Sequence, residues 1–216
     1  MTGKEPDASK EKKVSHYYSP EQDSDFVVSS VNAVLRNREF VFSTAPGVFS
    51  KSRVDPGTAL LVESVDRNWL SGKKKPKILD IGCGYGAVGI ALAREFPNAE
   101  VVMSDVNRRA LKLATINAKQ NNVSNVQILE SFLYDNIKGK FDLILSNPPQ
   151  SAGKDVCVGI IRGAHDFLKE GGIFMFVARH KKGGKTLEKE MIDAFGNSSV
   201  AARKSGYRVY LAVKKK

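Results

Sequence analysis

The sequence has few cysteines and no long apolar run, and each absence excludes a class of protein. The two cysteines, Cys83 and Cys157, cannot build a disulfide framework and lack the spacing of metal ligands. No apolar segment approaches the roughly 18–20 residues that cross a bilayer. Residues 1–13 are polar and lack the apolar region of a signal peptide. We therefore expect a cytoplasmic protein without a membrane span or a metal site.

Acidic side chains are also scarce relative to basic ones. The 34 lysines and arginines outnumber the 23 aspartates and glutamates, which leaves a formal net charge of +11. This excess favours a nucleic-acid partner, because each cation that neutralises a phosphate releases counterions and adds affinity. A solvated surface without such a partner is the simpler alternative.

At 216 residues, of which 42% are hydrophobic, the chain can bury one substantial core. Residues 1–15 contain few apolar side chains, and we expect them to be disordered. Residues 16–216 should form a single domain. In this domain an N-terminal extension, 16–72, is expected to pack on a core formed by residues 73–216.

The N-terminal extension should contain a small hairpin and a helix. Two apolar segments between residues 26 and 45 predict short strands joined by a polar turn. The sequence Asp55-Pro56-Gly57 then opens a helix, with proline in the first turn. We expect this helix to run to about Leu70, where Ser71-Gly72 ends it.

From residue 77 onward, segments typical of strands alternate with segments of helical periodicity. The alternation predicts a doubly wound α/β fold, with a mostly parallel seven-stranded sheet covered on both faces. Only residues 204–206 separate the last two strands, which is too short for a parallel crossover, so an antiparallel hairpin is expected. Strands are predicted at residues 77–81, 99–104, 125–130, 141–146, 172–178, 198–203 and 207–213. Helices are predicted at residues 86–96, 107–121, 154–169 and 185–195.

A glycine-rich turn follows the first strand of the predicted sheet. Gly82 and Gly84 allow the backbone to turn sharply and to pass close to a ligand. The turn lies at the carboxyl end of a strand, where open α/β sheets bind their ligands. Asp105 closes the next strand, where its carboxylate can accept hydrogen bonds from both hydroxyls of a ribose. The turn therefore predicts a nucleoside cofactor.

Two cofactor classes fit such a turn. Gly82-x-Gly84-x-x-Ala87 satisfies a loose dinucleotide fingerprint, with Asp105 at about the expected distance. Asp80, however, would repel a pyrophosphate, whereas it suits a positively charged amino-acid group. We therefore favour S-adenosyl-L-methionine, with S-adenosyl-L-homocysteine as product, over a nicotinamide cofactor.

The tetrapeptide Asn147-Pro148-Pro149-Gln150 follows the apolar strand at residues 141–146. The exocyclic amine of a base is a weak nucleophile, because its lone pair is delocalised into the ring. The Asn147 side-chain oxygen and the Pro148 carbonyl could accept both of its hydrogens, so alignment and preorganisation would carry the rate. These two residues are the catalytic candidates. The alternative is that the prolines merely end the strand.

Position 150 carries no aromatic ring to stack on a target base, so stacking must come from elsewhere or be weaker. Basic segment 179–185 follows the fifth strand, at the same rim as the tetrapeptide, and can contact RNA. The lysine-rich run 73–77 lies at the opposite rim and is expected to be a solvated loop. The substrate-binding candidates are Phe49, Pro149, Gln150, Arg179, Lys181 and Lys182.

These motifs resemble those of the seven-stranded class I methyltransferases. Residues 80–86 (Asp-Ile-Gly-Cys-Gly-Tyr-Gly) are similar to their first motif, Ser104-Asp105 to the second, and residues 146–149 (Ser-Asn-Pro-Pro) to the fourth. Residues 47–58 resemble a segment of the "small-domain" methyltransferases, which include bacterial rRNA guanine-N2 enzymes and archaeal relatives. The resemblance spans roughly residues 16–213.

The resemblance implies a division of the cofactor site. The loop would flank the methionine part, Asp105 would hold the ribose, and residues after the third strand would border the adenine. Phe132 stands where the family often has an acidic residue, so it can only line the pocket. The expected cofactor-binding residues are Asp80, Gly82, Cys83, Gly84, Asp105, Val106, Phe132, Leu133 and Asn147.

The resemblance, and not the residues themselves, implies guanine N2 of ribosomal RNA as the target. Cytosine N4, a tRNA guanine or a protein glutamine would present the same planar amino group. An RNA-binding assembly factor without turnover also remains open, although intact Asn147 and Asp80 argue against it.

Overall fold

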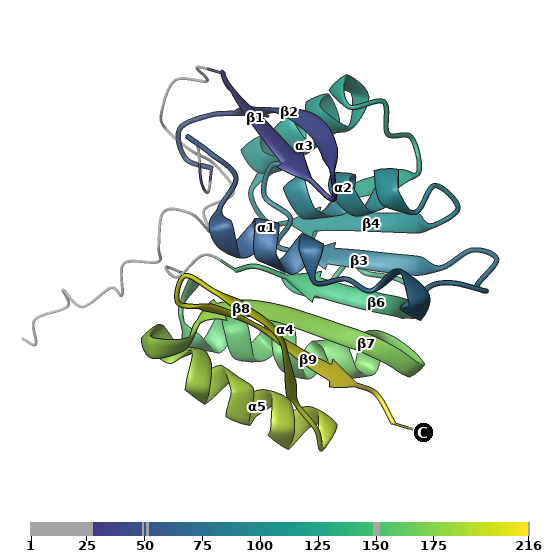
Figure 1. The fold of residues 1–216 in the computed structure, drawn as a ribbon, viewed down its shortest axis with the longest axis vertical. Helices are drawn as coiled ribbons and strands as arrows, with labels where there is room; N and C mark the ends of the chain where they lie inside the picture. The colour runs from purple at the N-terminus through teal and green to yellow at the C-terminus, as the bar shows by residue number, and fades with distance from the viewer. Residues whose placement is uncertain (1–27, 49, 51, 149–151, 216) are drawn as a thin grey trace, which may run out of the picture.

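The computed structural model describes residues 28–48, 50, 52–148 and 152–215. Its centre is a seven-stranded sheet in the order β5-β4-β3-β6-β7-β9-β8 (Figure 1). Strands β3 to β7 run parallel, whereas β9 is antiparallel to both β7 and β8. The predicted fold class is thus confirmed, including the C-terminal hairpin. The strands are β3 (Lys77–Ile81), β4 (Glu100–Asp105), β5 (Val126–Glu130), β6 (Phe141–Ser146), β7 (Leu168–Arg179), β8 (Ser199–Lys204) and β9 (Tyr207–Val213).

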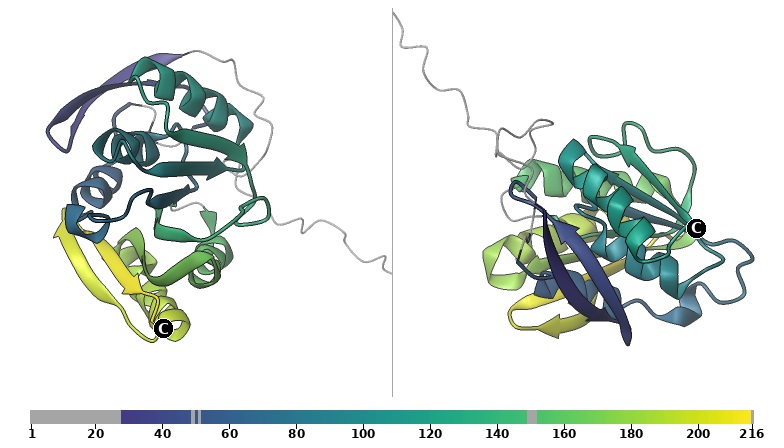
Figure 2. Two further views of the ribbon diagram at one scale, coloured as in Figure 1. Left: turned by 90° about the vertical axis from the view of Figure 1, so that its right-hand side faces the viewer. Right: turned by 90° about the horizontal axis from the view of Figure 1, so that it is seen from above.

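Helices cover both faces of this sheet (Figures 1 and 2). Successive side chains of a strand point to opposite faces, so Ile78 and Leu143 join one core while Leu79 and Ile144 join the other. Both cores are apolar, as expected of a sheet that is covered on both sides. The first core is covered by α1 (Pro56–Glu63), α2 (Ala87–Glu95) and α3 (Arg108–Gln120), and the second by α4 (Lys154–Phe167) and α5 (Lys185–Phe195).

The predicted N-terminal strands form a separate two-stranded hairpin. Strands β1 (Ser29–Leu35) and β2 (Arg38–Thr44) pair antiparallel. Both turn residues have positive φ, 50° at Arg36 and 59° at Asn37, which matches a two-residue hairpin turn. The hairpin lies along α3, where the Asn117 side-chain oxygen accepts a hydrogen bond from the Ser43 backbone N–H at 2.6 Å.

One helix differs from the prediction. The helix expected from residue 55 to about Leu70 ends at Glu63, and a short 3₁₀ turn, η2 (Arg67–Trp69), follows. The Asp66 carboxylate accepts a hydrogen bond from the Asn68 N–H at 2.9 Å and so begins the new turn. The expected boundary was wrong because this cap interrupts a continuous pattern. Helix α4 also ends at Phe167 rather than residue 169, because Leu168 already has the extended backbone of β7.

In the part of the chain that the structure describes, no helix has the length and apolar character of a membrane span. The tail predicted at residues 1–15 lies outside the described residues.

Candidate active site

The glycine loop between β3 and α2 is fastened to the end of β4. Gly82 and Gly84 have φ values of 73° and 57°, which favour glycine. The backbone N–H groups of Gly82 and Cys83 donate to the Ser104 carbonyl at 2.8 and 2.9 Å. The Gly84 N–H donates to Asp105 Oδ2 at 2.8 Å. The two motifs are therefore held together as one unit.

Asp80 is buried beneath this loop, with 1% of its surface exposed. Its Oδ2 accepts a hydrogen bond from the Gly89 N–H at 2.9 Å. Burial raises the pKa of Asp80 to about 7, while this hydrogen bond lowers it and the Asp105 charge raises it further. A cationic group beside the carboxylate would favour the charged form. The site thus suits the ammonium of a methionine moiety. Asp80 lines a small hollow together with Gly82, Cys83, Gly84 and Asn147.

A second hollow lies on the other side of the loop, around Asp105. Asp105 Oδ1 accepts from the Asn107 N–H at 2.9 Å, and Oδ2 accepts from Gly84. A carboxylate offers about four lone-pair sites, so Asp105 can still accept a ribose hydroxyl. Burial raises the pKa of this carboxyl, whereas the backbone N–H groups lower it. The hollow is lined by Gly82, Asp105, Val106, Phe132 and Leu133, together with Ile81, Ser131, Val156 and Ile160.

The second hollow thus brings together five of the residues expected to bind the cofactor. Phe132 is 47% exposed there and offers an apolar face. Val156 and Ile160, which lie one turn apart on α4, were not expected at the site. Their apolar i, i+4 spacing was visible in the sequence, but it is equally typical of core residues. Both hollows are small, about 30 and 20 Å³, so each can take only part of a cofactor.

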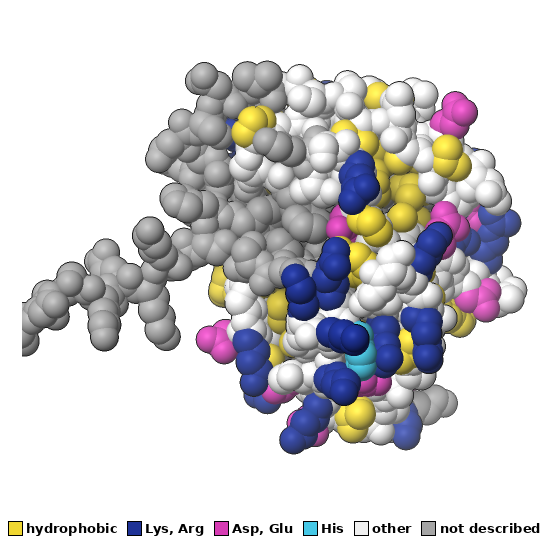
Figure 3. All heavy atoms as spheres, turned by 60° about the vertical axis from the view of Figure 1, so that its left-hand side comes forward, with side chains coloured by type: hydrophobic (Ala, Val, Ile, Leu, Met, Phe, Trp, Pro, Cys, Tyr) yellow, Lys and Arg dark blue, Asp and Glu magenta, His cyan; other side chains and the backbone are white. Residues whose placement is uncertain are grey.

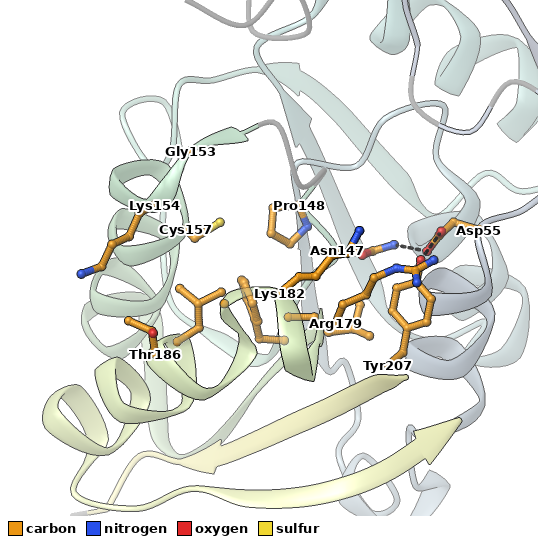
Figure 4. Close-up of a pocket in the computed structure, with 15 residues that line it drawn as sticks. Asp55, Asn147, Pro148, Gly153, Lys154, Cys157, Arg179, Lys182, Thr186 and Tyr207 are labelled. Carbon is orange, nitrogen blue, oxygen red and sulfur yellow. Dashed lines mark hydrogen bonds between the residues drawn. The ribbon is translucent and has the colours of Figure 1, made fainter. Parts of the chain in front are cut away.

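A larger cavity of about 690 Å³ opens beside Asn147 and Pro148, at the end of β6 (Figure 4). Asn147 lines this cavity and also the hollow that contains Asp80. Asn147 therefore lies where a cofactor in the first hollow would meet a substrate in the cavity. The cavity is also lined by Asp55, Gly153, Lys154, Cys157, Phe176, Val177, Ala178, Arg179, Lys182, Gly183, Thr186, Leu187 and Tyr207.

The Asn147 amide is held in one orientation. Its Nδ2 donates to Asp55 Oδ2 at 3.1 Å (Figure 4). The same nitrogen donates to Thr58 Oγ1 at 2.8 Å. A flipped amide would turn its oxygen toward the Asp55 carboxylate, which can only accept. Both N–H groups are thus engaged, and the side-chain oxygen remains as an acceptor.

Asp55 itself is fixed by two further elements. It is the N-cap of α1, where Oδ2 accepts from the Gly57 and Thr58 N–H groups at 2.8 and 3.1 Å. Its Oδ1 accepts from the Tyr207 hydroxyl at 3.0 Å. The Arg179 guanidinium lies over the Tyr207 ring, 4.6 Å from its centroid. Asp55 therefore joins α1, β6 and β9 at one point.

Sequence reasoning identified Asp55 only as the start of a helix, and it missed Thr58 and Tyr207. The segment at residues 47–58 carried a signal through its resemblance to small-domain methyltransferases. It did not reveal that these side chains contact Asn147.

The expected substrate residues divide into two groups. Arg179 and Lys182 line the large cavity, whereas Lys181 lines a neighbouring hollow. Phe49, Pro149 and Gln150 lie outside the described residues.

Both cysteines lie near the site without offering a thiolate. Burial raises the pKa of Cys83 well above its usual value, and the charges of Asp105 and Asp80 raise it further. Burial likewise raises the pKa of Cys157 to about 11. Both thiols stay protonated at neutral pH, so nucleophilic cysteine chemistry does not fit this site.

The fold and the loop define a class I S-adenosyl-L-methionine-dependent methyltransferase. The family described as "Methyltransferase small domain" matches residues 39–211, and the chain belongs to it.

Relatives with this domain are found among curated proteins. The chain is 37% identical to the uncharacterized protein YbxB of Bacillus subtilis over 201 residues, which cover 92% of this chain and 98% of that protein. It is also 37% identical over 137 residues to ribosomal RNA small subunit methyltransferase C of Haemophilus influenzae, covering 62% of this chain and 40% of the relative.

Solved structures agree with this family. The 16S rRNA N2 G1207 methyltransferase (RsmC) of T. thermophilus, in complex with AdoMet and guanosine, superposes with a TM-score of 0.76 and 27% identity. The match covers 89% of this chain and 52% of that one. This chain thus spans about half, or less, of the rRNA methyltransferases that it matches. A methyltransferase from Pyrococcus furiosus, at 23% identity and a TM-score of 0.57, shares the fold.

Proposed function

We propose that this protein methylates the exocyclic amine of a base in RNA, with guanine N2 of ribosomal RNA as its target. The observation that carries the proposal is the position of Asn147 between the Asp80 hollow and the large cavity. A base in that cavity would meet Asn147 where the methyl group is delivered.

The residues that line the Asp80 hollow and the Asp105 hollow fit S-adenosyl-L-methionine. Asp80 offers a buried carboxylate to the ammonium, and Asp105 offers two acceptor oxygens to the ribose. Phe132, Val106 and Leu133 offer apolar contact to the adenine. When bound, this cofactor would supply an electrophilic methyl group, which the target nitrogen would take with its lone pair while the carbon–sulfur electrons stay on sulfur. The methylated nitrogen would then release one of its two protons to solvent, which leaves a neutral N-methyl amine.

The role of the protein at the target nitrogen is to position it. The Asn147 side-chain oxygen and the Pro148 carbonyl accept the two amine hydrogens, which reduces delocalisation of the nitrogen lone pair into the ring. Thr58 and Asp55 keep the amide turned so that its oxygen is available. Preorganised acceptors of this kind need no reorientation during the reaction, and this is their main contribution to the rate.

The choice of rRNA guanine is supported by the named relatives and by the charge of the chain. The H. influenzae relative and the T. thermophilus structure are both named as rRNA methyltransferases, and the second holds guanosine. The net charge of +11 suits a polyanionic substrate. Arg179 and Lys182 bring part of that charge to the cavity.

Deletion of the gene, followed by mass spectrometry of nucleosides from separated rRNA and tRNA, tests the proposal. We expect the loss of N2-methylguanosine from rRNA and its return on complementation. Loss of a methylated cytidine, or of a guanosine from tRNA, would overturn the choice of target. Unchanged nucleosides would direct attention to a protein glutamine or to a role in assembly.

A further inference from the structure

A cationic hollow of about 550 Å³ adjoins the large cavity. The two share Arg179, Lys182 and Tyr207 as a common wall. On the face shown in Figure 3, which carries the carboxyl ends of the parallel strands, lysine and arginine side chains gather around a histidine. The hollow is lined by the end of β7, the connection η4 (His180–Gly184) and the β8–β9 turn: Arg179, His180, Lys181, Lys182, Arg203, Lys204, Ser205, Gly206, Tyr207 and Arg208.

Among the described residues, no ion pair offsets the positive charge of this hollow. No carboxylate is among its described lining residues. The crowded cations also affect the titration of His180. Loss of hydration, followed by the charges of Arg208, Lys185 and Arg203, lowers the pKa of His180, which Glu188 raises.

Two of the cations lie where their mutual repulsion lowers the stability of the sheet. Arg203 and Arg208 lie directly opposite each other in the antiparallel pair of β8 and β9. Like charges that lie directly opposite each other in such a pair destabilise a sheet. Stability therefore does not explain this pair, whereas an anion bound beside it would offset the repulsion.

The hairpin tip is tied to the active-site side of the hollow. The His180 N–H donates to the Gly206 carbonyl at 3.0 Å, and His180 Nδ1 lies 3.0 Å from the Tyr210 hydroxyl. In the sheet, Arg179 is paired with Tyr207, and Tyr207 with Lys204. The cations of β7, η4 and the hairpin thus form one continuous surface that starts at the wall of the large cavity.

We propose that this hollow and the β8–β9 turn hold the phosphates next to the target nucleotide of the RNA. The inference rests on the proposed function, because it needs a polynucleotide whose target base enters the large cavity. A base that has left its stack brings its own phosphate and its neighbours' to the rim of the pocket. Arg179 and Lys182 line both the cavity and the hollow, so the RNA strand would pass from the cavity along these two side chains to Arg203, Lys204 and Arg208.

Two triple variants with the same change in net charge test this inference. In the first, Arg203, Lys204 and Arg208 are replaced by glutamine. In the control, Lys74, Lys75 and Lys138 are replaced by glutamine; these are exposed and lie at the amino ends of the strands, on the opposite rim. Both proteins, and the wild type, are titrated with an unmodified small-subunit rRNA transcript at several salt concentrations, and methyl transfer to the same transcript is measured.

For a single strand, each lost phosphate contact reduces the steepness of log affinity against log salt by about 0.7. Near 0.15 M salt, the same loss weakens the affinity about fourfold. We expect the hairpin variant to lose about 50-fold in affinity and about 2 in slope if all three contacts are made. The control should stay within about threefold. Thermal unfolding of the hairpin variant should occur at the same temperature or a higher one, because the Arg203–Arg208 repulsion is removed.

Equal losses in the two variants would overturn the inference, since the attraction would then depend only on net charge. A hairpin variant that binds like the wild type would overturn it as well. If the wild type itself neither binds nor methylates the RNA, the proposed function fails first. Activity of the wild type therefore separates the two failures.

Discussion

Replacing Thr58 by valine would remove one of the two acceptors that orient the Asn147 amide. Valine has nearly the shape of threonine, so the change deletes the Oγ1 atom that accepts from Asn147 Nδ2 at 2.8 Å. The Thr58 backbone N–H still donates to Asp55, so the cap of α1 is preserved. The variant therefore perturbs the orientation of the amide with little effect on the helix.

The magnitude follows from one buried hydrogen bond. A buried neutral hydrogen bond contributes about 1 kcal/mol, and a donor left without an acceptor costs about 1–3 kcal/mol. If reaching the productive orientation of the Asn147 amide costs about 1–2 kcal/mol more in the variant, kcat falls about 5- to 30-fold. The cofactor Kd should change less than about threefold, although Thr58 also lines the Asp80 hollow.

Thr58→Ser is the matched control, because it keeps the hydroxyl and loses only the methyl group. We expect its kcat within about twofold of the wild type. Steady-state methyl transfer to rRNA, with cofactor affinity measured separately by calorimetry, distinguishes the two variants. A Thr58→Val variant that keeps its kcat within twofold would rule out this role of Thr58, and so would a serine variant that loses as much activity as the valine variant.

Three further predictions concern the two cofactor hollows and the residues that support Asn147. Cofactor affinity should be about tenfold weaker at pH 6 than at pH 8. The pKa of Asp80 is raised to about 7, and only the ionised carboxylate, which predominates above that pH, pairs with an ammonium. In calorimetry, Asp80→Asn should bind the cofactor weakly, with an affinity that does not change with pH. Tyr207→Phe removes one hydrogen bond to Asp55 and should lower the free energy of unfolding by about 1 kcal/mol in denaturant titrations, and full stability would contradict the contact. Phe132→Ala should weaken cofactor binding several-fold at unchanged saturating kcat, whereas a loss confined to kcat would argue against an adenine contact.

Local patterns were sufficient to predict the core of the fold. Strand-length apolar segments alternate with helical ones, and the three residues 204–206 expected between the last two strands leave no room for a parallel crossover. Asp80, Asp105 and Asn147 could be selected because each lies near the carboxyl end of a parallel strand. Those ends meet at one edge of the sheet, so their proximity follows from topology.

The support of Asn147 could not be predicted in this way. Its partners Asp55 and Thr58 lie 92 and 89 residues away, and Tyr207 reaches Asp55 across 152 residues. These contacts depend on how α1 packs against β7 and β9, which periodicity does not reveal. The early end of α1 has a different, local cause, since the Asp66 carboxylate caps a new turn at Asn68.

In the proposed mechanism, Asn147 accepts the hydrogens of an exocyclic amine during methyl transfer. The most direct measurement compares the wild type with Asn147→Ala on rRNA from a strain that lacks the gene, with the methylated nucleoside identified by mass spectrometry. We expect N2-methylguanosine from the wild type and a loss of at least about a hundredfold in kcat in the variant, with cofactor affinity nearly unchanged. Methylation of a ribose oxygen or a ring carbon, or near-normal turnover by Asn147→Ala, would contradict it.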